Sequence, residues 1–174
     1  VKLLNKLGYT VNIPNHPESA RAYISKGFLK EAKAIATENI KLFSTLISKD
    51  TPLIGIEPSA ILGFRDEYPN LVNASLKYTA KTLGLNTFTI EEFLSNELQD
   101  NKINISLFSN SPKTVYYHGH CHQKALSSNS HAVDILGFPI NFNVKTIDSG
   151  CCGMAGSFGY EKEHYELSQQ IGED

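Results

Sequence analysis

Apolar residues along the chain form short continuous runs that alternate with segments of helical periodicity. The runs at 10–13, 53–56, 86–88, 114–118 and 143–147 predict strands. Apolar positions at helical spacing predict helices over 25–47, 59–67, 70–83, 89–98 and 160–171, with further helical segments up to residue 136. Strands that alternate with helices favour an α/β fold, in which helices cover a sheet of parallel strands.

Individual residues mark where some of these helices are expected to begin or end. Ser25 is the expected N-cap of the first long helix, and Gly84 suits the position just after the helix that ends at residue 83. Thr89 followed by Glu92 forms a capping-box pattern, which predicts a helix start directly after a short strand.

The polar segment 100–112 divides the chain into two expected lobes, residues 1–100 and 113–174. A faint internal repeat supports this division. The motifs at 7–9 (Leu-Gly-Tyr) and 136–138 (Leu-Gly-Phe) are each followed by a predicted strand, a serine-containing loop and a predicted helix. The match is short, so coincidence is the alternative. We expect two pseudo-repeated βα lobes with parallel strands, and a site at the carboxyl ends of those strands.

Composition and charge exclude several classes of function. The 174 residues carry a formal charge of −2, and no apolar run approaches the ~20 residues of a membrane-spanning helix. Arg21 and Arg65 are the only arginines, which excludes an arginine-rich stripe for nucleic acids. The chain begins at Val1 without an initiator Met or a signal peptide, so we expect a segment of a longer protein.

The cysteines are the strongest chemical signal. There are three of them, Cys121, Cys151 and Cys152, and such an odd, local set does not fit a secreted disulfide framework. Each follows a predicted strand, and thiolates are ligands of iron–sulfur clusters and zinc. Glycines around the adjacent pair allow a loop to approach a cluster closely. Buried structural cysteines are the alternative interpretation.

Histidines next to Cys121 suggest a second kind of site. His118 and His120 lie two residues apart, so on an extended segment they would share a face. Together with the cysteines they could bind zinc, although each histidine alone also fits a structural role.

Glu57 stands at the end of a predicted strand. We expect this carboxylate either to accept backbone N–H bonds or to pair with Arg21 or Arg65.

Three longer segments resemble a known family. They are 57–68 (EPSAILGFRDEY), 118–126 (HGHCHQKAL) and 148–165 (DSGCCGMAGSFGYEKEHY). These segments are similar to the cysteine-rich CCG domain of heterodisulfide reductase (its B subunit) and of the glycolate oxidase iron–sulfur subunit. The similarity is greatest to the C-terminal domain of fused FAD/Fe–S dehydrogenases that act on D-2-hydroxy acids such as D-lactate.

The resemblance implies a role in electron transfer. The chain would receive electrons from FAD on another domain and pass them to a quinone or another acceptor. Cys121, Cys151 and Cys152 would ligate an iron–sulfur cluster of the [4Fe–4S] type, with the fourth ligand beyond Asp174. Ser19-Ala20-Arg21 stands where the first copy would carry its cysteines, so the first lobe is expected to hold no cluster.

The resemblance also implies partners and a location. FAD-binding and ferredoxin-like domains of the same polypeptide would be the partners, in the cytoplasm or peripherally at the inner face of the membrane. On its own the segment is not expected to be catalytic.

Other functions stay open at this point. They are a zinc-binding or purely structural docking module of the same enzyme, and thiol redox chemistry by the adjacent pair Cys151 and Cys152.

Overall fold

Two pairs of parallel strands lie at the centre of the chain. In this computed structural model, which describes residues 1–173, β1 (Leu53–Gly55) pairs with β2 (Thr87–Thr89), and β3 (Lys113–Tyr117) pairs with β4 (Phe142–Thr146). Parallel neighbours require a crossover connection, and helices occupy both crossovers. The mixed α/β character is therefore confirmed, although the strands form two separate sheets. Asp174, the expected end of the second lobe, lies outside the described residues.

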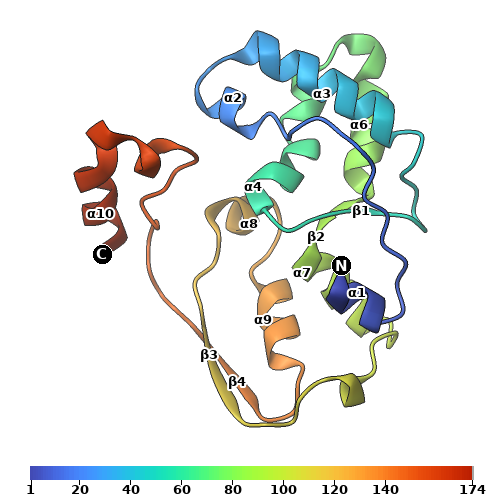
Figure 1. The fold of residues 1–174 in the computed structure, drawn as a ribbon, viewed down its shortest axis with the longest axis vertical. Coiled ribbons are helices and arrows are strands. Elements are labelled where there is room, and N and C mark those ends of the chain that lie inside the picture. The colour runs from blue at the N-terminus through green and yellow to red at the C-terminus, as the bar shows by residue number, and fades with distance from the viewer. Residues whose placement is uncertain (174) are drawn as a thin grey trace.

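The helices surround these strands on several sides (Figure 1). In that view α3 and α6 lie above the first sheet, α9 lies beside the second sheet, and the C-terminal helix α10 lies apart at the left. The α-helices are α1 (Lys2–Lys6), α2 (Arg21–Ser25), α3 (Leu29–Phe43), α4 (Pro58–Ile61), α5 (Tyr68–Leu71), α6 (Ala74–Leu85), α7 (Ile90–Gln99), α8 (Cys121–Leu126), α9 (Ser130–Gly137) and α10 (Tyr165–Glu173). Short 3₁₀ turns are η1 (Leu62–Phe64), η2 (Ile105–Leu107), η3 (Phe158–Tyr160) and η4 (Lys162–His164).

The expected long helix over 25–47 is broken near its start. Ser25 ends α2 instead of capping a helix, and Gly27 has a left-handed φ of +78°. The N–H groups of Gly27 and Phe28 donate to the carbonyls of Ile24 and Tyr23, at 3.1 and 2.9 Å. This pair of bonds is a Schellman motif, which ends α2 and lets α3 begin in a new direction.

Other expected elements also differ from the structure. The run at 10–13 forms no strand, because Pro14 follows it and no strand within 1–173 pairs with it. The expected helix 59–67 is the short α4 continued by η1, and the expected helix 70–83 is divided into α5 and α6 by the extended backbone of Val72. The expected helix 160–171 consists of 3₁₀ turns followed by α10.

Gly84 lies inside α6 and not after it. A Cβ atom at this position would come within 3.1 Å of the carbonyl oxygen of Phe64, so glycine allows α6 to pack closely on η1. Thr89 does cap α7 as expected, because its side chain accepts a hydrogen bond from the Glu92 N–H. The Glu92 carboxylate instead pairs with Arg65, at 2.6 Å.

A first core lies between α3, α5, α6 and the turns after β1. Its buried residues are Ala36, Ile40, Phe43, Ile61, Leu62, Phe64, Tyr68, Val72, Ala80 and Leu83. Tyr68 is fully buried, and its hydroxyl donates to the carbonyl of Ser19 at 3.0 Å and accepts from the Asn39 amide at 3.1 Å. Asn39 also donates to the carbonyl of Glu18, at 2.8 Å. These buried bonds fix the loop before α2 on the core.

A second core joins distant parts of the sequence. Leu4, Leu94 and Ile103 are buried there, and partly buried residues from α7, from α9 and from the segment after α1 pack around them. Tyr9 meets Phe93 edge to face with ring centroids 5.2 Å apart, and its hydroxyl donates to Glu97 at 2.6 Å. This core contains residues from both ranges expected as lobes, so the division at 100–112 stays a prediction.

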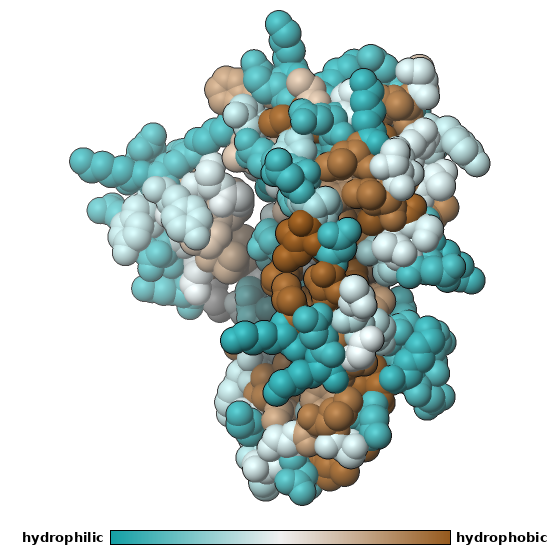
Figure 2. Space-filling view, turned by 45° about the vertical axis from the view of Figure 1, so that its right-hand side comes forward, coloured by the Kyte–Doolittle hydropathy of each residue, from teal (hydrophilic) through white to brown (hydrophobic). Residues whose placement is uncertain are grey.

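The surface carries apolar as well as polar side chains. Figure 2 shows apolar residues gathered in the middle of the face in view, with hydrophilic residues around them. Among the large apolar residues that are exposed are Ile13, Ile56, Tyr78 and Leu85. None of the helices within 1–173 has the length and apolar character required to cross a membrane.

Removal of the Tyr68 hydroxyl is expected to destabilise the fold. In Tyr68→Phe the Ser19 carbonyl and the Asn39 amide each lose a buried partner, so the free energy of unfolding should fall by about 1–2 kcal/mol. Tyr78→Phe is the matched control, because Tyr78 is 82% exposed. Urea unfolding measures both, and equal midpoints for the two variants would contradict this role of the hydroxyl.

The same residue predicts sensitivity to alkali. Burial raises the pKa of Tyr68 to about 12 from its ordinary 10. The unfolded chain therefore ionises first, and the contribution of Tyr68 to stability is complete below pH 10 and is lost as the pH rises towards 12. The free energy of unfolding, measured at several alkaline pH values, should fall less steeply with rising pH in Tyr68→Phe than in the unmodified chain. A loss of the same steepness would show that Tyr68 does not contribute.

Candidate functional site

The cysteines predicted from the sequence lie in two segments. Cys121 is the first residue of α8, which follows β3 after the short connection His118-Gly119-His120. Cys151 and Cys152 lie in the loop between β4 and η3. All three are free thiols and exposed. Their role as ligands stays a prediction.

One group of metal-ligating atoms is close enough to share an ion. Side-chain atoms of His120, Cys121 and His122 lie within 4.8 Å of one another, and within 1–173 they are the one set of three His, Cys, Asp or Glu residues this tight. Cys151 and Cys152 lie outside this set. His118 also lies outside it, and its Nε2 is buried without a hydrogen-bond partner among the described residues. His122, which directly follows Cys121, belongs to the same histidine-rich segment but was not among the expected ligands.

His120 holds the start of α8 in place. As N-cap, its Nδ1 accepts a hydrogen bond from the His122 backbone N–H at 3.2 Å. Its Nε2 lies 3.4 Å from Glu57 Oε1. The imidazole therefore joins α8 to the turn after β1.

Glu57 caps α4, and its carboxylate lies between two segments. Oε1 accepts from the backbone N–H and the hydroxyl of Ser59, at 3.1 and 2.7 Å, as expected for a backbone-capping carboxylate. The expected pairing with Arg21 or Arg65 is wrong, because these arginines pair with other glutamates. Burial acts to raise the pKa of Glu57, but the bonds from Ser59 and the nearby histidines lower it overall.

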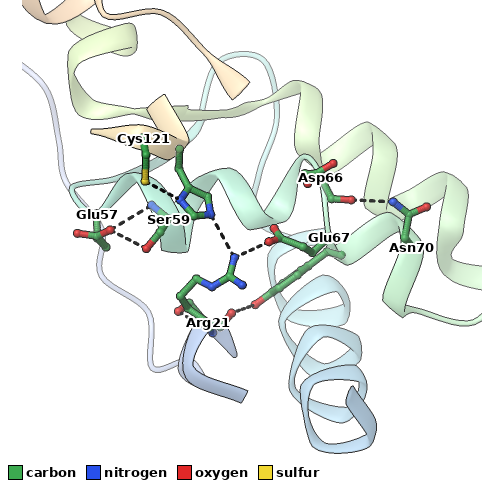
Figure 3. A network of polar contacts seen from close by, with 10 residues as sticks. Arg21, Glu57, Ser59, Asp66, Glu67, Asn70 and Cys121 are labelled. Carbon is green, nitrogen blue, oxygen red and sulfur yellow. Dashed lines mark hydrogen bonds and ion pairs between the residues drawn. The ribbon is translucent and has the colours of Figure 1, made fainter. Parts of the chain in front are cut away.

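His122 contacts both Cys121 and Arg21, and Figure 3 shows these two residues on different segments of the site. Its Nδ1 is 3.6 Å from Cys121 Sγ, and its Nε2 is 3.4 Å from Arg21 Nη1. Arg21 also forms an ion pair with Glu67. Burial and the positive charge of Arg21 lower the pKa of His122, so the neutral imidazole is favoured.

The loop with the adjacent cysteines is bound closely to α10. Gly153 has φ of +78°, and a Cβ atom there would lie 2.1 Å from the Ser168 carbonyl oxygen. The Ser168 hydroxyl donates to the Gly153 carbonyl at 2.9 Å, and the Gly153 N–H lies 3.4 Å from Cys151 Sγ. Glycine in this loop was expected to allow close approach to a cluster. In the structure Gly153 is required because α10 lies in close contact with the loop.

The known proteins to which the chain is similar are dehydrogenases or a subunit of one. Over 174 residues the chain is 28% identical to the C subunit of the anaerobic glycerol-3-phosphate dehydrogenase of Escherichia coli, a match that covers 99% of the chain and 42% of the relative. It is 30% identical over 179 residues to the D-2-hydroxyglutarate dehydrogenase of Haemophilus influenzae, and 27% identical over 173 residues to that of Pantoea ananatis. These two matches cover 98% of the chain but only 17% and 16% of the relatives.

The chain thus spans less than half the length of these relatives. No family model matches the sequence, and no solved structure matches it. The expected similarity to dehydrogenases of D-2-hydroxy acids agrees with the relatives that carry the name D-2-hydroxyglutarate dehydrogenase. The similarity to the CCG domain stays a prediction.

A methyl group at Gly153 is expected to loosen α10. Gly153→Ala places a side chain in a left-handed conformation, which alone costs roughly 1–2 kcal/mol, and in contact with the Ser168 carbonyl. Backbone amides of α10 should exchange with deuterium about 10-fold faster or more, which is about 1.4 kcal/mol. Gly150→Ala is the matched control, because nothing lies within 4 Å of its Cβ position. Unchanged exchange in Gly153→Ala would contradict this close contact.

Proposed function

We propose that the chain is an iron–sulfur electron-transfer domain of an FAD-linked dehydrogenase that oxidises a D-2-hydroxy acid. The observation that carries this proposal is the match of nearly the whole chain to a small part of much longer dehydrogenases. A short segment shared by enzymes with different substrate names is more suited to a common step than to substrate choice. Electron transfer is such a common step.

Cys121, Cys151 and Cys152 are the proposed ligands. A cluster of the [4Fe–4S] type would accept and release single electrons when bound there. The three thiols are free and exposed, which ligation from the surface requires. Polar groups lie beside two of the sulfurs: the Gly153 N–H donates to Cys151, and the His122 imidazole contacts Cys121. The three cysteines leave one position of such a cluster to another ligand.

The remaining parts of the reaction belong to other domains in this proposal. FAD and the hydroxy acid would bind elsewhere in the same polypeptide, which also holds ferredoxin-like domains. The electrons would leave to a quinone or another acceptor, with the protein in the cytoplasm or at the inner face of the membrane.

Zinc is the second candidate for this site, because His120, Cys121 and His122 offer three ligand atoms within 4.8 Å. The hydrogen bonds of His120 act against it. Since Nδ1 accepts the His122 N–H, the proton of the neutral imidazole is on Nε2 and faces Glu57. Ligation through Nε2 would move this proton to Nδ1 and break the cap of α8. These hydrogen bonds therefore disfavour zinc at His120, and the three cysteines stay the proposed ligands.

Anaerobic reconstitution of the chain tests the two candidates. Ferrous iron and sulfide are added with excess thiol, which supplies the ligand that the three cysteines leave open. Bound iron, acid-labile sulfide and the EPR signal after reduction are then measured. We expect stoichiometric iron and sulfide, and a loss of more than half of both in Cys121→Ser, Cys151→Ser and Cys152→Ser. Ser149→Ala is the matched control, because it changes a polar residue of the same loop that is not a proposed ligand.

Two outcomes would contradict the iron–sulfur proposal. One is the absence of bound iron and sulfide from the unmodified chain. The other is binding of one zinc ion per chain that survives in air and is lost in His120→Ala, which would favour the zinc-binding module.

A further inference from the structure

A continuous set of polar contacts runs from Glu67, at the start of α5, through Arg21 to the sulfur of Cys121. Glu67 pairs with Arg21 (Figure 3). Arg21 in turn contacts His122, and His122 contacts Cys121. These residues come from the N-terminus of α5, the start of α2 and the start of α8. The contact between Arg21 and His122 joins residues that lie 101 positions apart in the sequence.

The chemistry of Arg21 determines where the proton of His122 lies. A guanidinium is a hydrogen-bond donor only and stays charged at all ordinary pH values. His122 Nε2, 3.4 Å from Arg21 Nη1, can therefore only accept, so it carries a lone pair. A neutral imidazole holds one ring proton, and this proton must then be on Nδ1. Nδ1 is the atom that faces Cys121 Sγ, at 3.6 Å.

We propose that Arg21 holds His122 in the Nδ1–H tautomer, so that the imidazole donates a hydrogen bond to the Cys121 sulfur and is not itself a metal ligand. Arg21 and His122 are then positioning residues. His122 contacts the sulfur, and Arg21 acts through His122. A doubly protonated ring would instead turn an N–H donor and a positive charge towards the Arg21 guanidinium, 3.4 Å away.

The position of Arg21 is well determined by its surroundings. Ala20, the residue before it, is fully buried with a left-handed φ of 58°. The carbonyls of Glu18 and Ser19 accept hydrogen bonds from Asn39 and from Tyr68. The Arg21 side chain itself is only 19% exposed, and the Glu67 carboxylate neutralises its charge. The guanidinium is thus oriented before any ligand binds.

The second imidazole of the group has a different proton arrangement. His120 Nδ1 accepts the His122 backbone N–H, so its proton is on Nε2 towards Glu57. The two histidines that flank Cys121 are therefore expected to be opposite tautomers. This difference gives the proposal a signature that a purely structural role of the histidines would not produce.

The consequence for electron transfer rests on the proposed function. An N–H donor beside a ligating thiolate withdraws negative charge from the sulfur, which favours the reduced cluster and raises its reduction potential. Removal of the Arg21 guanidinium frees the imidazole to adopt its other tautomer. The potential of a reconstituted cluster should then fall.

The first experiment needs no cluster. Long-range ¹H–¹⁵N correlation spectra of the chain without metal identify the tautomer of each neutral histidine, and His122 is assigned by the signals lost in His122→Gln. We expect Nδ1–H for His122 and Nε2–H for His120. In Arg21→Met the His122 signals should shift to a pattern in which Nε2–H predominates. Arg65→Met is the matched control, because it also removes a partly buried Arg–Glu pair but one without a histidine contact.

The results separate the proposal from its alternatives. Nε2–H at His122 in the unmodified chain, or the same tautomer in Arg21→Met when circular dichroism shows a folded chain, would overturn it. A direct shift of the His122 Nδ1 resonance on addition of Zn²⁺ alone, at one ion per chain, would also overturn it, because Nδ1 would then be a ligand.

The second experiment measures the reduction potential of the reconstituted cluster. A lower potential in Arg21→Met than in Arg65→Met and the unmodified chain supports the proposal, and an equal potential in all three would overturn its functional part. If no cluster forms while the two tautomers are found as expected, the proposed function fails and the assignment of His122 stands.

Discussion

The buried hydrogen bonds of Tyr68 and Asn39 are the contacts on which the arrangement around Cys121 depends. They hold the carbonyls of Glu18 and Ser19 against the first core, and Arg21 follows directly after this loop. A side chain as long as arginine loses considerable conformational freedom when it is fixed in one geometry. Here that cost is offset by a backbone that the core already orders and by the ion pair with Glu67. The charged groups near the thiol are therefore oriented by residues that do not touch it.

The carboxylate and imidazole contacts around Cys121 divide into two sides. On one side Glu57 and His120 cap short helices with their side chains. On the other side Glu67 pairs with Arg21, which contacts His122. Each of these acidic residues faces a cationic or hydrogen-bond-donating partner, so the charged groups of the site compensate one another close to the sulfur. For Arg21 and Glu67, which are largely buried, removal of one partner would leave the other with an uncompensated desolvation penalty.

Local signals in the sequence predicted the strands at 53–56, 86–88, 114–118 and 143–147 to within one or two residues, because short apolar runs bounded by polar residues have few alternatives. The cap at Thr89 was predicted for the same reason. The break at Gly27 was not predicted, because the helical spacing of the apolar residues continues across this glycine. The contact of His122 with Arg21 could not be predicted, because it depends on how two segments far apart in sequence pack. The glycines beside Cys151 and Cys152 were expected to let the loop approach a cluster. At Gly153, however, the close packing of α10 is by itself a sufficient reason for glycine.

The second core has a consequence for how the chain reaches its folded state. Its apolar side chains come from α1 at the beginning of the chain and from α9 beyond residue 130. During synthesis the second core therefore cannot be complete until the residues of α9 have been made. Contacts of such long sequence separation form late and slowly, because a large loop has to close first. The buried residues of the first core all lie between positions 36 and 83, so this core can form independently of that closure.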